Sequence, residues 1–167
     1  RRGVAEMTLC FMIGLSRNIF FSARGLLDDD DWSKVGGGDL SGRIVGIIGV
    51  GHIGKEVIRI LQPFGCKIVV NDILDQTDYY QSMGVTEISK EKLYASADII
   101  SIHTTLEQST RGMIDKEALS KMKQTAYLIN VARGGIVDQN DLKIKLNMKN
   151  QEDYKVFKKV RDLKDIF

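Results

Sequence analysis

A glycine-rich turn between two apolar runs constrains this chain more than any other feature. Residues 44–48 form an apolar run, and Gly49, Gly51 and Gly54 follow at G-x-G-x-x-G spacing. Apolar side chains at helical spacing then continue over 53–61, and a second apolar run over 68–70 leads to Asp72. This order predicts a strand, a tight turn, a helix and a second strand that ends near an acid.

Each part of this unit has a chemical role in binding a dinucleotide. Gly49 permits the tight turn, Gly51 lets the backbone approach a pyrophosphate, and Gly54 lets the helix pack closely on the strand. The start of the helix offers unpaired N–H groups and a positive dipole end to phosphates. Asp72 is placed to accept the ribose hydroxyls. The flanking pattern favours a dinucleotide site over an ordinary strand-to-helix turn.

The same glycines also satisfy a second motif, which the next residue excludes. Gly49 to Lys55 reads as G-x-x-x-x-G-K, the phosphate loop of nucleoside triphosphatases. That loop needs a Ser or Thr hydroxyl after the lysine to bind Mg²⁺, whereas this chain has Glu56. An acid there would repel a triphosphate, so the three-glycine interpretation is preferred.

The remaining pattern predicts an α/β fold. Apolar segments indicate strands near 85–88, 98–103 and 126–131, and they alternate with helical patterns over 77–83, 90–97, 115–122 and from 138 onward. Nearly continuous apolar strands that alternate with helices are typical of a parallel sheet covered on both faces. We therefore expect a Rossmann-type, doubly wound parallel sheet with helices on both faces.

The first part of the chain reads as one long helix over 4–24. Its apolar face is too broad for burial against one neighbour, and Val4, Met12, Ile19 and Phe20 are expected to form an exposed patch. An acidic run over 28–31 and three glycines over 36–38 then indicate a solvated loop. Residues 1–27 are accordingly assigned as an interdomain or interface helix.

Composition narrows the class of protein. A length of 167 residues with 43% hydrophobic and 28% charged residues fits one soluble globular domain. Cys10 and Cys66 lack the spacing of metal ligands and are expected to be buried free thiols in a reducing cytoplasm, so no metal site is predicted. No stretch is long and apolar enough to predict a membrane span.

The end of the chain is basic, because residues 143–167 contain eight Lys or Arg and four Asp or Glu. It lacks the interleaved glycines and stacking aromatics of a nucleic-acid-binding segment. Apolar residues at helical spacing predict a basic helical tail instead.

Four blocks resemble the NAD-binding domain of the D-isomer-specific 2-hydroxyacid dehydrogenases. They are VAEMTL with LSRNI, the glycine block, ADIISIHTTLEQSTRGMID, and KMKQTAYLINVARGGIVDQNDL. The resemblance covers roughly residues 3–142, and Asn-x-x-Arg-Gly-x-x-Val-Asp in the last block is the most specific part. It implies an oxidoreductase domain over 28–142 that binds NAD and acts on a 2-oxo or 2-hydroxy acid.

Arg133 is the expected catalytic residue of this chain. It follows a buried strand and therefore lies at the carboxyl edge of the sheet, where ligands of doubly wound folds bind. A guanidinium can hold the substrate carboxylate through two hydrogen bonds while it polarises the adjacent carbonyl. In the family the matching arginine has that role.

The resemblance assigns further residues to the cofactor. Those that match His52 and Ile53 contact the pyrophosphate through their backbone, and those that match Val131 and Ala132 lie near the nicotinamide. The adenine and ribose pocket is lined by residues that match Thr104, Thr105 and Thr110, although Thr105 stands where the family usually has proline. Charge favours NAD over NADP, because Asp72 would repel a 2′-phosphate and no arginine follows it immediately.

The catalytic histidine and glutamate of the family have no match here. The chain contains only His52 and His103, and neither occupies the family's acid–base position. The resemblance also ends after Leu142, which a truncation, a frameshift or real divergence would explain, and Arg1 opens inside a predicted helix. We therefore expect a fragment without a substrate domain that is inactive alone.

Three functions are compatible with these observations. The leading one is the NAD-binding part of a D-2-hydroxyacid dehydrogenase, expected to form a homodimer and to bind neither nucleic acid nor membrane. The alternative is a non-catalytic NAD-sensing or corepressor-like module, against which the retained Arg133 argues. A third, an adenosylhomocysteine hydrolase-like domain, conflicts with the block over 130–138.

Overall fold

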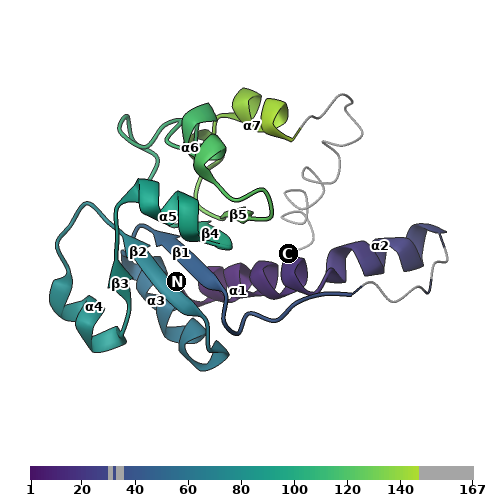
Figure 1. The fold of residues 1–167 in the computed structure, drawn as a ribbon, viewed down its shortest axis with the longest axis horizontal. Helices are drawn as coiled ribbons and strands as arrows, with labels where there is room; N and C mark the ends of the chain where they lie inside the picture. Colours follow the sequence, from purple (N-terminus) through teal and green to yellow (C-terminus); the bar gives the residue numbers. More distant parts are fainter. Residues whose placement is uncertain (30–31, 33–35, 147–167) are drawn as a thin grey trace.

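The computed structural model describes residues 1–29, 32 and 36–146 (Figure 1). Most of the predicted basic tail, residues 147–167, lies outside the described residues. Only its first residues are described, and they complete a helix that the pattern from residue 138 onward predicts.

Five parallel strands form a single sheet in the order β3-β2-β1-β4-β5. Val45 of the central strand pairs with Ile68 on one side and with Ile99 on the other. This arrangement confirms the predicted doubly wound parallel sheet. The strands are β1 (Ile44–Ile48), β2 (Lys67–Asn71), β3 (Thr86–Glu87), β4 (Ile99–Ile102) and β5 (Tyr127–Asn130).

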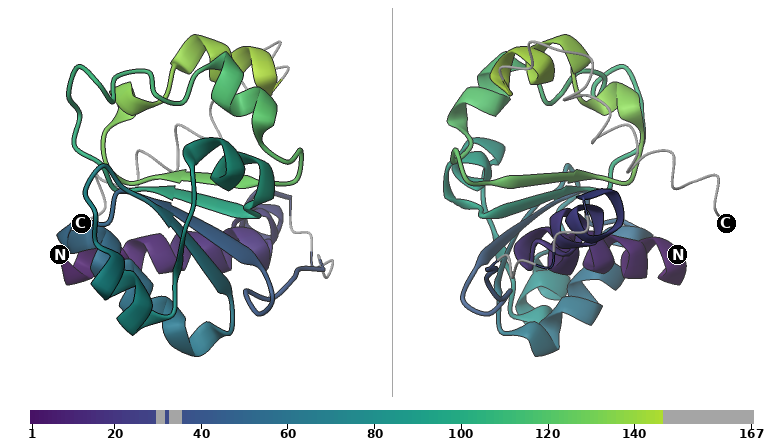
Figure 2. Two further views of the ribbon diagram at one scale, coloured as in Figure 1. Left: turned by 60° about the vertical axis from the view of Figure 1, so that its left-hand side comes forward. Right: turned by 90° about the vertical axis from the view of Figure 1, so that its right-hand side faces the viewer.

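Helices cover both faces of the sheet (Figure 2). The first face carries α1 (Arg2–Ser16) and α3 (His52–Leu61), with α4 (Thr77–Met83) beside them. The second carries α5 (Lys90–Ser96), α6 (Lys116–Lys121) and α7 (Gln139–Lys145). Short 3-10 turns, η1 (Gln62–Phe64) and η2 (Gly134–Ile136), follow α3 and β5.

The sheet separates two apolar cores. Met12, Ile47 and Leu61 are fully buried on the first face, and Leu93, Ile100 and Ile136 are fully buried on the second. Because both faces are buried, the central strands carry apolar residues almost without interruption, and all four residues of β4 are buried. This burial explains why the strands read as continuous apolar runs.

The prediction of one helix over 4–24 is wrong, because the chain breaks after Ser16. Asn18 adopts a left-handed conformation with φ of 55°, and α2 (Ile19–Asp29) then leaves at 73° to α1. Asn tolerates this conformation better than most residues, so it can end one helix before the next begins. The helix also continues through Asp29, into the segment predicted as an acidic loop.

The break changes which apolar residues are exposed. Met12, predicted to belong to an exposed patch, is completely buried on α1. In contrast, α2 projects away from the sheet at the right of Figure 1 and exposes Ile19, Phe21 and Leu27. Among the described helices, α2 therefore exposes the largest group of apolar side chains.

The thiols also differ from expectation, because Cys10 is exposed on α1 and Cys66 is only half-buried. Both are free, as predicted. Within the described ranges no single helix is long and apolar enough to cross a membrane. The pair α1 and α2 passes that test together, but only across the bend between them.

Candidate functional site

The predicted site residues are brought to one edge of the sheet. Because β1, β2, β4 and β5 are parallel, the segments that follow them all leave at their carboxyl ends. These segments contain the glycine turn, Asp72, Thr104 and Arg133. The chain runs from β1 outward to β2 and β3 and then returns to β4 on the other side of β1. The site thus lies at the switch point of the sheet, where doubly wound folds bind ligands.

The glycine turn has the geometry that the three-glycine motif predicts. Gly49 has a φ of +90°, and a Cβ there would lie 2.9 Å from backbone atoms of His103 and Thr104. A Cβ on Gly54 would lie 2.1 Å from the carbonyl oxygen of Gly49, so helix and strand pack as closely as predicted. Gly51 differs, because nothing lies within 4 Å of the position of its Cβ. The space in front of Gly51 is open to a ligand.

The first turn of α3 faces this open space. Gly51 is its N-cap, and a glycine has no side chain that could cap the helix. The first N–H groups of a helix have no partner within the helix, so Gly51, His52 and Ile53 present donors and a positive dipole end. His52 is exposed and Ile53 is half-buried. This arrangement suits a phosphate or pyrophosphate.

The residues of the rejected triphosphatase motif are engaged elsewhere. The ammonium of Lys55 lies over the ring of Tyr79, 4.6 Å from its centroid. Glu56 pairs with Arg59 at 2.8 Å and with Arg2 of α1 at 3.0 Å. Hydrogen bonds from these arginines lower the pKa of Glu56 to about 2. Glu56 therefore remains a carboxylate that joins α1 to α3.

Asp72 holds the loops around it. Its Oδ2 accepts a hydrogen bond from the N–H of Val50, and its Oδ1 accepts one from the N–H of Leu74 at 2.9 Å. From the same loop, the Gln76 side chain donates to the carbonyl oxygen of Val50 at 3.2 Å. Each carboxylate oxygen keeps a further lone pair for a ribose hydroxyl. The acid thus both supports the glycine turn and borders the site.

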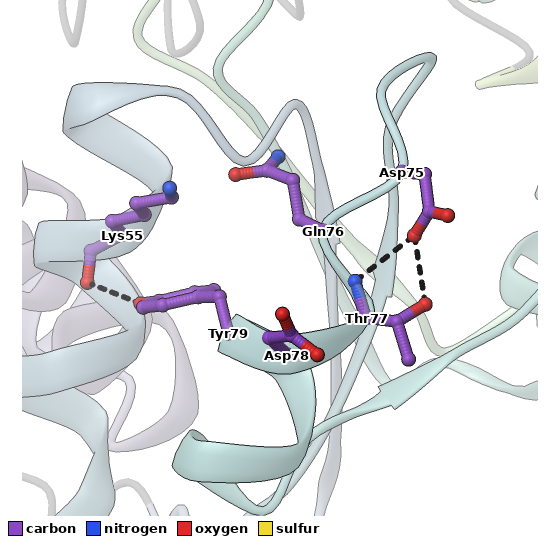
Figure 3. Close-up of a pocket in the computed structure, with 6 residues that line it drawn as sticks. All are labelled: Lys55, Asp75, Gln76, Thr77, Asp78 and Tyr79. Atoms are coloured by element: carbon purple, nitrogen blue, oxygen red, sulfur yellow. Dashed lines mark hydrogen bonds between the residues drawn. The ribbon is translucent and has the colours of Figure 1, made fainter.

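A surface hollow of about 390 Å³ opens beside this loop, between α3 and the start of α4. Figure 3 shows Lys55 and Tyr79 on one side of it and Asp75 and Thr77 on the other. Asp75 accepts hydrogen bonds from the N–H and the hydroxyl of Thr77, which lower the pKa of its carboxyl. Asp75 is thus ionised and fixed beside the loop that carries Asp72.

The end of β4 supplies two buried polar atoms without partners. The Nε2 of His103 lies 2.9 Å from the hydroxyl of Ser101, while its Nδ1 and the hydroxyl of Thr104 have no hydrogen-bond partner among the described residues. Burial lowers the pKa of His103 to about 4, so the ring is neutral at physiological pH. Buried polar atoms usually have a partner, so the Thr104 hydroxyl marks a place for a ligand group.

The other two threonines stabilise their own loop. The hydroxyl of Thr105 donates to Glu107 at 2.7 Å. The hydroxyl of Thr110 donates to the carbonyl oxygen of Thr105 at 2.6 Å and accepts from the N–H of Glu107 at 2.8 Å. Contact of Thr105 and Thr110 with a nucleotide stays a prediction. The structure gives them a role in shaping the loop.

Arg133 stands in a turn that Asn130 organises. The Asn130 side chain accepts from the N–H of Ala132 at 3.1 Å and donates to the carbonyl oxygen of Arg133 at 2.8 Å. The Arg133 side chain is exposed, and its guanidinium donates to the carbonyl oxygen of Ala132 at 2.9 Å. Val131 and Ala132 are half-buried at the end of β5. Most of the donors of Arg133 thus remain available to an anion.

These residues fit a dinucleotide. The open space at Gly51, the uncapped start of α3 and the unpartnered Thr104 hydroxyl belong to one edge, together with Asp72. A metal centre lacks comparable support, because no group of three or more His, Cys, Asp or Glu side chains in the described part of the chain could hold an ion.

Residues 9–156 match the model of the D-isomer specific 2-hydroxyacid dehydrogenase, NAD binding domain. The chain belongs to this family. The range matched by the family model reaches beyond Leu142, where the sequence analysis ends the domain. The domain boundary at residue 142 stays a prediction. The domain is the NAD-binding domain of an oxidoreductase family that acts on hydroxy and keto acids.

Individual relatives agree with this membership. The chain is 41% identical over 106 residues to a glyoxylate reductase from Korarchaeum cryptofilum. This aligned stretch covers 64% of this chain and 32% of that protein. It is 35% identical over 137 residues to D-3-phosphoglycerate dehydrogenase from Bacillus subtilis, covering 81% and 26%. This chain thus spans about a quarter to a third of the length of these two curated relatives.

Among solved structures, the NAD-complexed D-isomer specific 2-hydroxyacid dehydrogenase from Lactobacillus delbrueckii ssp. bulgaricus has a TM-score of 0.80 at 34% identity. The similarity covers 87% of this chain and 44% of that one. The relatives compared are named as dehydrogenases and reductases, and nothing in them supports the non-catalytic sensing module or the adenosylhomocysteine hydrolase.

Sequence reasoning missed two side chains that shape the site in this NAD-binding domain. Asn130 is the first residue of the Asn-x-x-Arg signature, and an Asn at a strand end that bonds the backbone two residues on is a known turn signal. Gln76 carries no such signal, because its bond to Val50 joins segments far apart in the sequence.

Proposed function

We propose that this domain binds NAD(H) across the carboxyl edge of its sheet and, in the whole protein, presents the nicotinamide to a 2-oxo or 2-hydroxy acid held by Arg133. The observation that carries the proposal is the convergence of an open glycine turn, Asp72, the Thr104 hydroxyl and Arg133 at one switch point. The family match supports the cofactor, and the relatives' names support the class of substrate.

Each group has a distinct role in this function. The N–H groups of Gly51, His52 and Ile53 hold the pyrophosphate, and Asp72 accepts ribose hydroxyls. Thr104 lines the adenosine half, with Thr105 and Thr110 shaping its loop, and Val131 and Ala132 adjoin the nicotinamide. When bound, NAD(H) supplies or accepts the hydride.

Arg133 anchors the substrate through its carboxylate. A guanidinium that binds a carboxylate and the neighbouring carbonyl oxygen orients the carbon that exchanges hydride and stabilises charge on the oxygen. A proton must also move to or from that oxygen. His52 and His103 do not match the family's acid–base position, so this chain alone is expected to turn over no 2-oxo acid.

The same proposal covers location and assembly. Free thiols on Cys10 and Cys66 support a reducing cytoplasmic environment. The exposed apolar side chains of α2 support a homodimer, since a monomer with that surface would be prone to associate.

Binding of the reduced cofactor tests the proposal directly. We expect NADH to bind more tightly than NADPH in a fluorescence titration, because Asp72 repels a 2′-phosphate. Gly51→Ala should weaken NADH binding about ten-fold or more while it preserves the melting temperature, since its methyl enters open space where the pyrophosphate must approach.

Gly3→Ala is the matched control, because nothing lies within 4 Å of that Cβ either and Gly3 is on α1, outside the glycine motif. It should leave NADH binding unchanged and should not lower the melting temperature. Equal weakening by the two variants, or equal affinities for NADH and NADPH, would contradict the assignment of the site.

A further inference from the structure

Two side chains from one loop hold two successive peptide groups of the glycine turn. Asp72 accepts from the N–H of Val50, which fixes the peptide between Gly49 and Val50. Gln76 donates to the carbonyl oxygen of Val50 at 3.2 Å, which fixes the peptide between Val50 and Gly51. The turn is therefore held from the loop between β2 and α4, outside the glycine motif itself.

The bond from Gln76 satisfies a carbonyl group that lacks another partner. Val50 is completely buried, and in the described part of the chain Gln76 is the one donor to its carbonyl oxygen. A buried carbonyl without a hydrogen bond is costly, so the turn would rearrange to find a partner if Gln76 were lost. The carbonyl only accepts, so the amide nitrogen of Gln76 must face it.

Because the peptide group between Val50 and Gly51 is planar, the bond from Gln76 also sets the direction of the N–H of Gly51. A trans peptide group is rigid, so its C=O and N–H point in opposite directions. When Gln76 holds the carbonyl oxygen of Val50 toward the loop, the N–H of Gly51 is aimed away from the loop. That N–H belongs to the uncapped start of α3, beside the open space at Gly51.

Tyr80 is buried close to Asp72 and Gln76. It lies at the centre of α4, four residues after Gln76, and is only 3% exposed. Burial first, and the charge of Asp72 second, raises its pKa to about 12, so the phenol stays protonated beside these two side chains. The side chain of Gln76 therefore lies next to a helix that is packed into the core.

We propose that Gln76 is a positioning residue for the pyrophosphate of the dinucleotide, because it orients the Val50–Gly51 peptide. This inference rests on the proposed function and adds to it a residue outside the glycine motif. It predicts that the effect of Gln76 depends on the phosphates of the ligand and is independent of the adenosine part.

The test compares Gln76→Leu with a matched variant. Gln62→Leu removes a bond of the same kind, since the Gln62 amide donates to the carbonyl oxygen of Met83 at 3.0 Å, on η1 after the far end of α3. Binding of NADH, ADP and adenosine is measured by titration. We expect Gln76→Leu to weaken NADH and ADP about three- to ten-fold and to leave adenosine unchanged, as the loss of one net hydrogen bond implies.

A spectroscopic readout separates positioning from general destabilisation. In the ligand-free protein, the backbone amide resonance of Gly51 should shift in Gln76→Leu and stay in place in Gln62→Leu. If Gln62→Leu weakens ADP equally, if adenosine weakens along with ADP, or if the Gly51 resonance does not move, the inference is overturned. Failure of the unmodified chain to bind NADH or ADP would instead refute the proposed function.

Discussion

His103 and His52 both follow strands that end at the functional edge, yet their environments are opposite. His52 is exposed at the start of α3, whereas the Nδ1 of His103 is buried at the end of β4 without a partner among the described residues. Burial lowers the pKa of His103 to about 4 from an ordinary value of 6.5. Its neutral form therefore belongs to the folded state.

This environment predicts a pH dependence of stability. Between pH 6.5 and 4 the unfolded chain binds a proton at His103 that the folded chain excludes, so stability is fully present above about pH 6.5 and falls as the pH drops toward 4. The loss attributable to this group is about 3 kcal/mol. Urea unfolding at stepped pH should show this slope in the unmodified chain and a smaller one in His103→Gln.

His52→Gln provides the control, because this ring is exposed at the start of α3. Its unfolding profile should follow that of the unmodified chain. An unchanged slope in His103→Gln would show that the ring is accessible to protons in the folded state.

At the scale of elements, Glu56 joins the first helix to the helix that begins the site. Arg2 of α1 and Arg59 of α3 both bond its carboxylate, and the pKa of Glu56 falls to about 2 from an ordinary 4.5. A lowered carboxyl pKa means that this link is complete above about pH 4.5 and is lost as the pH falls toward 2.

Removing the negative charge of Glu56 should therefore detach the first turn of α1 from α3. We expect Glu56→Gln to increase hydrogen exchange in the first turns of α1 several-fold at neutral pH, with little change in the sheet. Glu117→Gln is a suitable comparison, because the ion pair of Glu117 with Lys121 lies within the single helix α6. Equal exchange at α1 in both variants would show that apolar packing alone attaches this helix.

The elements themselves were largely predictable from the sequence. The periodicity between residues 44 and 145 places each strand and helix within a few residues, because continuous apolar runs mark buried strands and helical spacing marks their covers. The bend after α1 was not predictable from spacing, since the apolar pattern continues across it. A single residue in a left-handed conformation, Asn18, changes the direction of the chain.

The site was predictable only in part. The turn of Gly49 and the close packing at Gly54 follow from the motif, and the structure confirms that geometry. The anchoring of Val50 by Gln76 depends on how two distant segments approach, which no local pattern encodes. Contacts of these residues with NAD stay predictions.

At the scale of the whole molecule, α2 carries an apolar surface that is exposed in the described part of the chain. Phe21 is 60% exposed and Leu27 is 82% exposed on this projecting helix. We expect the chain to self-associate as a two-fold dimer, because an isologous contact buries the same patch on both copies. Light scattering coupled to size exclusion measures the mass.

Phe21→Asp should shift the population toward monomer at tens of micromolar. Ile144→Asp, which alters an apolar residue of comparable exposure on α7, should leave the mass unchanged. A soluble monomer of the unmodified chain at the same concentration would contradict the dimer, and polydisperse material would point to aggregation instead.

The packing of α1 has a consequence for synthesis on the ribosome. This helix precedes every strand in the sequence, yet it packs against α3 and β5, and its buried Met12 belongs to a core that includes Ile129. The two elements α3 and β5 therefore cannot cover the apolar face of α1 until both have been translated. Before that point this face lacks its partners within the domain, and the rate of translation sets how long the interval lasts.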